Sequence, residues 1–508
     1  MKIARNWKAI LFSDLGVLIW LAIGLLVLHT LTNNQYGFHR DELNFLDDGR
    51  HLAWGYVDCP PLAPVIARLS LVLFGKSLVG LRFFPALAQS LVLILTGLMV
   101  RELGGKRWAQ ITASIASATA PVALSEGSLF MYLSFDMLWW VLTAYFTIRL
   151  LHNEDARWWL GIGVALGLGM LTKFTIAYLA AGIVAGVLFT PVRRYLKSPW
   201  LWAGAGLALL FFLPNLIWMA QHNYITLEKL IFVHNRDVQA GYTRSFLPDQ
   251  LYVSTNIAAL FLWLGGLRYF WLDTEGRRFR LIGWMFAVPF AFFLIMQGRG
   301  YYTAPLYPML IAGGTYAAEK RRLSMTGAAR TRLDTLLYTS LTVSGLVAWA
   351  FSAPIAPLNS TWWKLIDQVS PQVFREEIGW PELVQQIAGI RDTLPAKDRS
   401  QLGILANNYG EAGAINLYGP AYNLPIAISG IDSYWLWGYG DPPPQTLIVV
   451  GFKSSTANSW FQSCTRVGTV TNPYGIKNEE TSNHNEILLC RKLLYQWPAF
   501  WKKFHWFG

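Results

Sequence analysis

Long apolar runs recur along this 508-residue chain, and they constrain its fold more than any other feature. A helix of about 20 apolar residues is enough to cross a hydrocarbon core of about 30 Å. The chain is 54% hydrophobic and only 14% charged, which leaves too little polar surface for a soluble globule of this size. We therefore expect an α-helical polytopic membrane protein with about eleven transmembrane helices. The expected spans are residues 14–31, 79–100, 107–124, 132–151, 157–172, 174–191, 200–220, 251–271, 281–296, 302–318 and 334–351.

The first run lacks a small-residue cleavage site, so we interpret it as a retained helix and not as a signal peptide. The net charge of +12 is distributed unevenly over the loops between the runs. Positively charged loops stay in the cytoplasm, which predicts a cytoplasmic N-terminus and, for an odd number of spans, an external C-terminus. The residues in these loops are Lys2, Arg5, Lys8, Arg101, Lys106, Arg107, Arg157, Arg193, Arg194, Lys197, Arg277, Arg278, Arg280, Lys320, Arg321, Arg322, Arg330 and Arg332.

We expect a multi-pass protein of the plasma (inner) membrane. Nucleic-acid binding is excluded as an explanation of the basic charge, because the basic residues are scattered over short loops and form no single stripe. The chain shows no internal repeat, which weakens the case for a transporter built from inverted repeats.

The composition changes after Phe351. Residues 352–508 are richer in Asn, Pro and Gly and contain strand-like runs at 402–406 and 446–452. Short strands that alternate with helices predict a mixed α/β domain of about 150 residues. We therefore divide the chain into a transmembrane domain, 1–351, and an extracytoplasmic soluble domain, 352–508. Cys464 and Cys490 lie in the latter, where either a disulfide or two buried thiols fits the sequence.

The adjacent carboxylates of Asp41 and Glu42 stand out in the first external loop, 32–78. Carboxylates at the mouth of a membrane helix cost solvation energy unless they pair, bind a metal or take part in chemistry. Apolar residues at helical spacing predict a short interfacial helix at 43–54. Pro60-Pro61 then breaks the chain before a second short helix at 62–74.

Four motifs, in order along nearly the whole chain, resemble those of a known family. They are Asp41-Glu42 with Pro60-Pro61-Leu62, LTKFTIAYL at 171–179, GRGYYTAPLYPML at 298–310, and NYGEAGAINLYGPAYNLP at 408–425. Together they are similar to the C-type (GT-C) integral membrane glycosyltransferases, specifically the family 39-like group of protein mannosyltransferases and aminoarabinose transferases. The resemblance implies transfer of a sugar from a polyprenyl-phosphate donor to a lipid, polysaccharide or protein acceptor on the outer membrane face.

An inverting transfer needs one carboxylate to accept the proton of the acceptor hydroxyl. The resemblance favours Asp41 as this base, with Glu42 beside it; the alternative is that Arg40 or Arg50 neutralises the pair in a structural salt bridge. Asp136, at the external end of an apolar run, is a second catalytic candidate that would align the acceptor. Helix capping or a structural pair is its alternative role.

Cations and phenols near the external helix ends are candidates for binding the donor phosphate, which needs positive or hydrogen-bonding partners. The alternative role for Tyr301 and Tyr302 is aromatic-belt anchoring. For Lys173 the alternative is a side chain that extends to the interface, and for His234 and Arg236 it is a solvated 221–250 loop. The candidates are Arg299, Tyr301, Tyr302, Lys173, His234 and Arg236.

No His or Cys spacing typical of a metal site occurs, and the resemblance implies a metal-independent enzyme. The pairs Asp41-Glu42 and Asp47-Asp48 still offer oxygen ligands for Mg²⁺ or Mn²⁺. One departure from the family concerns the residue before Pro60-Pro61, which is often Lys or His there and is Cys59 here. A neutral thiol is a poor phosphate ligand, so either another cation contacts the donor or its head group differs.

Two other function classes compete with the transferase. A flippase or transporter of polyprenyl-linked lipids would place charge at mid-membrane depth, whereas the notable acids here cluster at external helix ends. A structural or sensory membrane protein would not need the aromatic-rich, acid-bearing first loop. The sequence leaves the sugar, the polyprenol, the acceptor and the oligomeric state undetermined.

Overall fold

The computed structural model describes residues 11–369 and 373–508, which fold into two compact units. Unit 1 contains the described residues up to Thr32, Cys59–Ala63 and Arg82–Ala353. Unit 2 contains Asn33–Asp58, Pro64–Leu81 and the described residues of Pro354–Gly508. The expected division into a transmembrane domain, 1–351, and an extracytoplasmic soluble domain, 352–508, stays a prediction. Of the residues used for the orientation argument, Lys2, Arg5 and Lys8 lie outside the described part.

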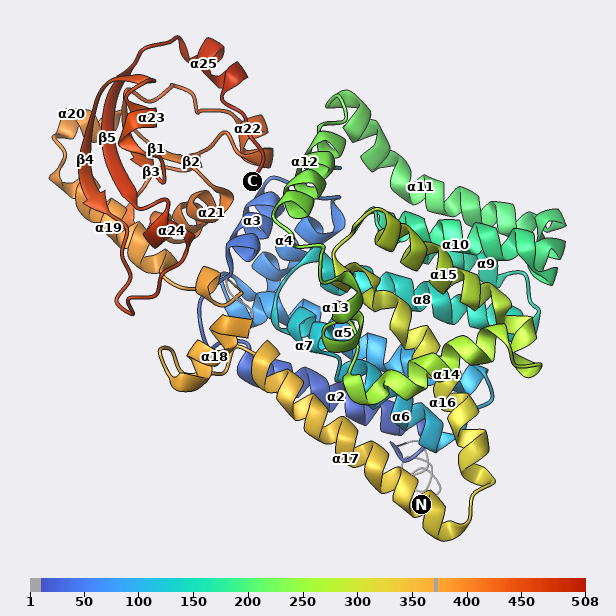
Figure 1. Cartoon of the computed structure of the whole chain (residues 1–508). Helices are drawn as coiled ribbons and strands as arrows, with labels where there is room; N and C mark the ends of the chain where they lie inside the picture. Colours follow the sequence, from blue (N-terminus) through green and yellow to red (C-terminus); the bar gives the residue numbers. More distant parts are fainter. Residues whose placement is uncertain (1–10, 370–372) are drawn as a thin grey trace, which may run out of the picture. The chain divides into compact units, whose positions relative to one another are not determined.

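The described part of unit 1 is built from helices (Figure 1). Its longer helices are α2 (Asp14–Thr32), α5 (Leu78–Glu102), α6 (Arg107–Ala118), α8 (Tyr132–Asn153), α9 (Trp158–Met170), α10 (Ile176–Phe189), α11 (Pro199–Gln221), α12 (Ile225–Gln239), α14 (Leu260–Trp271), α15 (Arg280–Ile295), α16 (Tyr307–Leu323) and α17 (Gly327–Ser352). Shorter segments connect them: α7 (Pro121–Ser128), η1 (Pro191–Lys197), α13 (Phe246–Tyr252), η2 (Ile257–Ala259), η3 (Glu275–Phe279) and η4 (Gly300–Leu306).

Among the described residues, five helices are long and apolar enough to cross a membrane, and up to seven if each of two bent pairs is one span. The bent pairs are α10 with η1, and α13 with η2 and α14. The chain is thus an integral membrane protein of the expected helical class, and each of the eleven apolar runs contains helix. The run 107–124 is divided into two helices. α6 ends at Ala118, and α7 begins at Pro121, because proline is favoured at the first position of a helix.

Small residues let the apolar helices of unit 1 approach closely. A Cβ on Gly163 of α9 would lie 2.1 Å from the carbonyl oxygen of Gly204 in α11. A Cβ on Gly314 of α16 would lie 1.7 Å from the carbonyl oxygen of Leu262 in α14. Membrane helices associate through such backbone contacts, because lipid provides no hydrophobic drive between them.

Unit 2 contains a mixed five-stranded sheet in the order β2-β1-β3-β5-β4. The strands are β1 (Leu402–Ala406), β2 (Ala427–Ile428), β3 (Thr446–Val450), β4 (Phe461–Thr469) and β5 (Glu486–Leu493). β1 pairs in parallel with β2 and β3, whereas β5 is antiparallel to β3 and β4. Both runs expected to be strands form the sheet centre, as β1 and β3. β3 is buried along its whole length, as its continuous apolar sequence requires.

Helices accompany this sheet in unit 2 (Figure 1). They are α3 (Arg40–Arg50), α4 (Leu62–Phe74), α18 (Thr361–Val369), η5 (Arg375–Glu377), α19 (Trp380–Thr393), α20 (Ala396–Ser400), α21 (Tyr409–Tyr418), η6 (Gly419–Tyr422), α22 (Asp432–Trp437), α23 (Ser454–Ala457), α24 (Glu479–Ser482) and α25 (Trp497–Lys503). The helix expected at 62–74 has these bounds in α4. The helix expected at 43–54 is α3, which begins three residues earlier, at Arg40, and is buried from Glu42 to Gly49.

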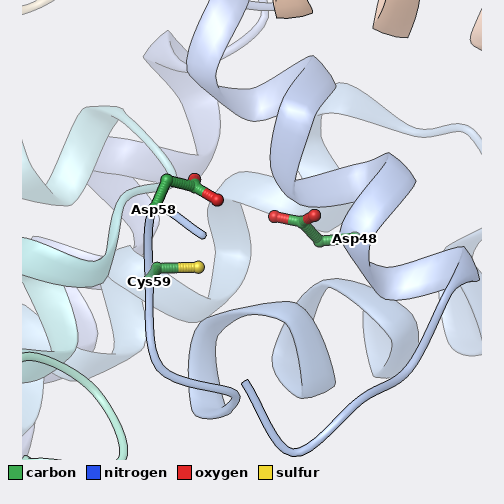
Figure 2. A group of neighbouring side chains, drawn as sticks. All are labelled: Asp48, Asp58 and Cys59. Carbon is green, nitrogen blue, oxygen red and sulfur yellow. The ribbon is translucent and has the colours of Figure 1, made fainter. Parts of the chain in front are cut away.

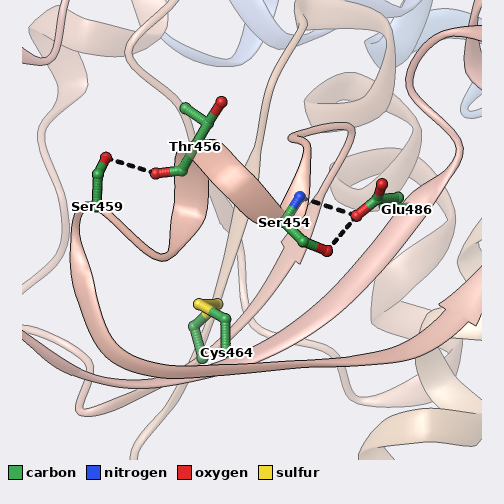
Figure 3. Close-up of a disulfide and its surroundings, with 6 residues drawn as sticks. Ser454, Thr456, Ser459, Cys464 and Glu486 are labelled. Atoms are coloured by element: carbon green, nitrogen blue, oxygen red, sulfur yellow. Dashed lines mark hydrogen bonds between the residues drawn. A yellow bond between two sulfur atoms is a disulfide. The ribbon is translucent and has the colours of Figure 1, made fainter.

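Cys464 and Cys490 form a disulfide between β4 and β5 (Figure 3). The two cysteines are direct partners in the antiparallel register, so the strand pairing itself brings the sulfur atoms together. This settles the alternative that the sequence left open. Cys59 is a buried cysteine outside any disulfide.

Candidate active site

Asp41 lies in the first turn of α3, and its side chain is 25% exposed. Its Oδ1 accepts a hydrogen bond of 2.9 Å from the hydroxyl of Tyr409, the first residue of α21. Its Oδ2 lies 3.5 Å from Nδ1 of His39, a nitrogen that accepts a hydrogen bond from the Asp41 backbone N–H. One oxygen is therefore held while the other keeps its capacity to accept a proton.

Glu42 is fully buried and caps the N-terminus of the same helix. Its Oε2 accepts a hydrogen bond of 2.8 Å from the backbone N–H of His39, and the His39 side chain accepts one from the backbone of the first turn. Together these two bonds form a capping box. These contacts give Glu42 a structural role beside Asp41. Its expected part in catalysis stays a prediction.

The two arginines that were the alternative partners of Asp41-Glu42 pair with other acids. Arg50 donates a hydrogen bond of 2.7 Å to Asp47. Arg40 donates to Glu479, lies 3.8 Å from Glu376 and covers the Tyr409 ring at 4.8 Å. The salt-bridge alternative for Asp41 is therefore not what the described residues form.

Arg40 is surrounded by a group of carboxylates that we call the Arg40 acid cluster: Glu376, Glu411, Glu479 and Glu480. Burial, followed by the charge of Glu480, raises the pKa values of Glu376 and Glu411 to about 8. Oxygens of Glu376, Glu479 and Glu480 lie within 4.8 Å of one another, a spacing that suits a divalent cation. Here the guanidinium of Arg40 supplies the positive charge.

A second carboxylate pair in unit 2 consists of Asp48 and Asp58, whose carboxylates face one another in Figure 2. Their nearest oxygens lie within 4.8 Å, and Nδ2 of Asn44 donates to both, at 3.4 Å and 2.9 Å. Burial and the charges of Asp58, Asp47 and Asp432 raise the pKa of Asp48 well above its ordinary value. The pair offers carboxylate oxygens, the ligand type that a hard divalent ion takes.

Asp47 is the one member of the expected Asp47-Asp48 pair with a full set of protein partners. It binds Arg50, and its Oδ2 accepts hydrogen bonds from Asn416 at 2.7 Å and from Tyr434 at 2.8 Å. Burial raises the pKa of Asp47, and these three partners oppose that shift. Asp47 is therefore a structural residue that joins α3 to α21 and α22.

In unit 1, Asp136 is buried at the second turn of α8 and does not cap the helix, whose N-cap is Met131. Its oxygens accept hydrogen bonds from Trp140 at 3.0 Å and from Thr175 at 2.9 Å. The capping alternative for Asp136 is therefore wrong.

Lys173 follows α9 and interacts electrostatically with Asp136 and with Glu126 of α7. Its ammonium lies 3.8 Å from the centre of the Tyr302 ring and 5.3 Å from that of Tyr132. Two rings and two carboxylates thus hold the charge inside unit 1, which argues against a side chain that only extends to the interface.

Arg299 precedes η4 and forms a two-point ion pair with Asp237, with both N–O distances at 2.6 Å. Its guanidinium also covers the ring of Tyr242 at 5.1 Å. Tyr301 and Tyr302, the first residues after Gly300 in η4, pack edge to face at 4.8 Å. Asp136, Lys173 and Tyr302 therefore lie together. Tyr301 packs against Tyr302, and Arg299 interacts electrostatically with both tyrosines.

His234 and Arg236 lie on α12, which occupies the middle of the expected 221–250 loop, and both side chains are exposed, as the solvated alternative expects. Its sequence from Ile225 to Gln239 contains neither glycine nor proline, and Gly241, at φ +78°, follows its end. Arg236 lies 3.3 Å from the same Asp237 that binds Arg299. His234 lines an open pocket of about 280 Å³ with Gln297.

Two residues that the sequence did not single out belong to these groups. Tyr409 follows Asn408, which with Glu411 forms the Asn-x-x-Glu pattern of a helix start. That pattern predicts the helix but not the contact with Asp41. Glu126 was detectable as an isolated acid between the expected spans 107–124 and 132–151, and its Oε2 accepts a hydrogen bond of 3.4 Å from Gln89.

Comparisons with known proteins agree with this architecture. The sequence profile of the dolichyl-phosphate-mannose-protein mannosyltransferases matches residues 58–218. Undecaprenyl phosphate-alpha-4-amino-4-deoxy-L-arabinose arabinosyl transferase 1 of Pseudomonas fluorescens is 27% identical over 298 residues, which are 53% of this chain and 52% of that protein. Lipid A galacturonosyltransferase RgtD of Rhizobium johnstonii is 26% identical over 230 residues, 44% of this chain and 46% of that protein. The chain thus spans about half the length of these curated relatives.

The crystal structure of ArnT from Cupriavidus metallidurans bound to undecaprenyl phosphate has a similar fold, with a TM-score of 0.57 at 13% identity. The match covers 93% of this chain and 97% of that one. The resemblance expected from the sequence motifs, to protein mannosyltransferases and aminoarabinose transferases, is confirmed by the sequence profile and by the relatives. At this identity the structural likeness establishes the fold alone.

Proposed function

We propose that the chain is a membrane glycosyltransferase that moves a sugar from a polyprenyl-phosphate donor to an acceptor hydroxyl with inversion. The observation that carries the proposal is the Asp41 carboxylate, which is anchored through Oδ1 and partly exposed. In this reaction the acceptor oxygen bonds to the anomeric carbon as the bond from that carbon to the phosphate oxygen breaks. Asp41 takes the hydroxyl proton, and polyprenyl phosphate leaves as an anion, so no second acid is needed.

The donor phosphate needs cations, and unit 1 offers two that are fixed in place. Lys173 is held between the rings of Tyr302 and Tyr132, and Arg299 is oriented by Asp237. Fixed charges stabilise a leaving phosphate without reorganisation at the moment of reaction. Tyr301 and Tyr302 add phenols beside them. Asp136 would orient either Lys173 or the acceptor, and His234 and Arg236 are assigned to the donor with the support of the Asp237 contact alone.

The acceptor that we propose is a glycolipid, and a polysaccharide or a protein are the other classes to be tested. Support comes from the names of the relatives, one of which is a lipid A transferase. The names of these relatives give aminoarabinose and galacturonic acid as the transferred sugars. Position 59 of this chain is a cysteine and not Lys or His, so the sugar of its donor is to be determined separately. Parallel assays with each donor would identify it.

We further propose eleven spans, a cytoplasmic N-terminus and an extracytoplasmic 352–508 domain in the inner membrane, supported by the distribution of basic loops. A reporter fused after Gly508 should be active only outside the cytoplasm, and one fused after Arg194 only inside. A cytoplasmic signal from the first fusion would put Asp41 on the wrong side.

Transfer is proposed to need no metal. Dialysis of the purified protein against a chelator should leave turnover unchanged. Loss of turnover that added Mn²⁺ or Mg²⁺ restores would overturn metal independence and direct attention to Asp48 and Asp58.

The decisive experiment replaces Asp41 by asparagine, which keeps the size and the contact with Tyr409 but accepts no proton. A positioned base contributes about 10²–10⁴-fold, so turnover of a polyprenyl-phosphate sugar should fall by that factor. Binding of the donor and the expression level should stay at the wild-type values. Near-normal turnover of Asp41→Asn would refute the assignment. A wild-type protein that transports the carrier lipid but forms no glycosylated product would refute the transferase itself.

A further inference from the structure

The contact between Asp41 and Tyr409 joins two segments that lie 368 residues apart in the chain. Burial and the neighbouring Asp41 charge raise the pKa of Tyr409 well above its ordinary value. The phenol therefore keeps its proton and is the donor in the 2.9 Å hydrogen bond to Oδ1. Oδ2 lies 3.5 Å from Nδ1 of His39, a nitrogen that already accepts from the Asp41 N–H, and among the described residues Oδ2 accepts no hydrogen bond like that of Oδ1.

Tyr409 is held in position from several sides. The guanidinium of Arg40 lies over its ring, and the Arg40 acid cluster fixes that guanidinium through Glu479 and Glu376. The helix that begins at Tyr409 is capped by Asn408, whose side chain accepts from the Glu411 N–H at 2.8 Å. A half-buried ring that is held under Arg40 and follows a capped helix start loses little further freedom when its hydroxyl binds Asp41.

The two helices also approach so closely that the hydroxyl has little room to move away. A Cβ on Gly413 of α21 would lie 2.8 Å from Cβ of Leu43 in α3. A Cβ on Gly410 would lie 2.9 Å from Cβ of Arg40. Two glycines three residues apart therefore set the distance between α21 and the first turns of α3 that carry Asp41.

We propose that Tyr409 is the positioning residue for Asp41: its hydroxyl holds Oδ1, orients the carboxylate and leaves Oδ2 to accept the proton of the acceptor hydroxyl. The C-terminal segment thereby contributes a residue to the transfer step. This inference rests on the proposed function of Asp41 as the base.

Tyr409→Phe tests the proposal, because phenylalanine keeps the ring under Arg40 and removes only the hydroxyl. A hydrogen bond to a charged group corresponds to a factor of roughly 10 to 100, so kcat should fall by that factor at unchanged donor KM. The melting temperature should also stay at the wild-type value, since the ring keeps its packing under Arg40. Tyr422→Phe is the matched control: Tyr422, at the end of η6, is 36% exposed, and its substitution should change neither quantity.

Three results separate the possible failures. If Asp41→Asn loses its activity while Tyr409→Phe keeps the wild-type kcat, the positioning role is refuted and the proposed function stands. If Tyr409→Phe lowers kcat and the melting temperature and also raises the donor KM, Tyr409 is structural and the proposal is equally refuted. If Asp41→Asn retains its turnover, both proposals fail, because Tyr409 then has no base to position.

Discussion

Gly413→Ala tests whether the close approach of α21 to α3 controls activity. The added Cβ would lie 2.8 Å from Cβ of Leu43 and 2.9 Å from its carbonyl carbon and oxygen. Carbon atoms reach their optimal separation at about 3.5–4.0 Å, so the helices have to separate by roughly 0.5–1 Å. Two of the three contacted atoms belong to the backbone, which cannot rotate away as a side chain can.

The expected cost follows from two opposing effects. Overpacking of this kind costs about 1–3 kcal/mol. Alanine in a helix recovers about 0.5–1 kcal/mol relative to glycine, which leaves a net loss of stability of about 0–2.5 kcal/mol. Turnover should suffer more, because a misplacement of about 1 Å near the reacting groups lowers the rate by up to about 10²-fold.

The assay compares the melting temperature and the turnover of the purified full-length protein in detergent. Gly389→Ala is the matched control, since Gly389 also lies in a helix of unit 2 and a Cβ there would meet nothing within 4 Å. That variant should be as active as the wild type and at least as stable. Equal turnover in Gly413→Ala and Gly389→Ala would refute the reasoning.

Three further outcomes are expected. Burial raises the pKa of Glu411 from 4.5 to about 8. Between these two pH values the folded protein therefore keeps a proton that the unfolded chain has lost. Stability should therefore fall as the pH rises through this window, by up to about 1.4 kcal/mol per pH unit, and thermal melts of Glu411→Gln should show a flatter dependence; an unchanged slope would contradict this. Replacing Cys464 and Cys490 by alanine opens a loop with a sequence separation of 26 and should lower stability by about 3.5 kcal/mol in a denaturant titration, whereas a loss below 1 kcal/mol would show that the bond is not stabilising in this way. Arg299→Lys loses the planar two-point geometry and should raise the donor KM about tenfold in steady-state kinetics, and an unaltered KM would remove Arg299 from the donor site.

Local patterns in the sequence predicted local structure well. Pro60-Pro61 followed by an apolar run gave the bounds of α4, and two β-rich runs gave the central strands β1 and β3. Hydropathy identified helix at every expected span. Among the described residues, however, only five to seven helices are long and apolar enough to cross a membrane, because several helices are short or bent. Periodicity cannot show where a proline such as Pro121 divides one apolar run into two helices.

Contacts between distant segments were beyond the sequence. The Asn-x-x-Glu pattern at 408–411 indicates a helix start near Tyr409, yet nothing local shows that the Tyr409 hydroxyl binds a carboxylate 368 residues earlier. The same holds for Arg40, whose partners Glu376 and Glu479 lie in the C-terminal part of the chain. Adjacent acids such as Asp41 and Glu42 look equivalent in the sequence, and only the fold assigns the capping contact to Glu42 and leaves an open oxygen on Asp41.

A double-mutant cycle connects the glycine contact with the positioning role of Tyr409. If Gly413 affects turnover because it sets the distance from the Tyr409 hydroxyl to Asp41, Gly413→Ala should lower kcat in the wild-type background and have little further effect in Tyr409→Phe. Two residues that act through one contact give non-additive free energies, whereas independent effects add to within about 0.3–0.5 kcal/mol. The melting temperatures should nevertheless fall in both backgrounds, because the clash with Leu43 persists without the hydroxyl. Additive losses of kcat would mean that α21 affects catalysis by a route other than the Tyr409–Asp41 hydrogen bond.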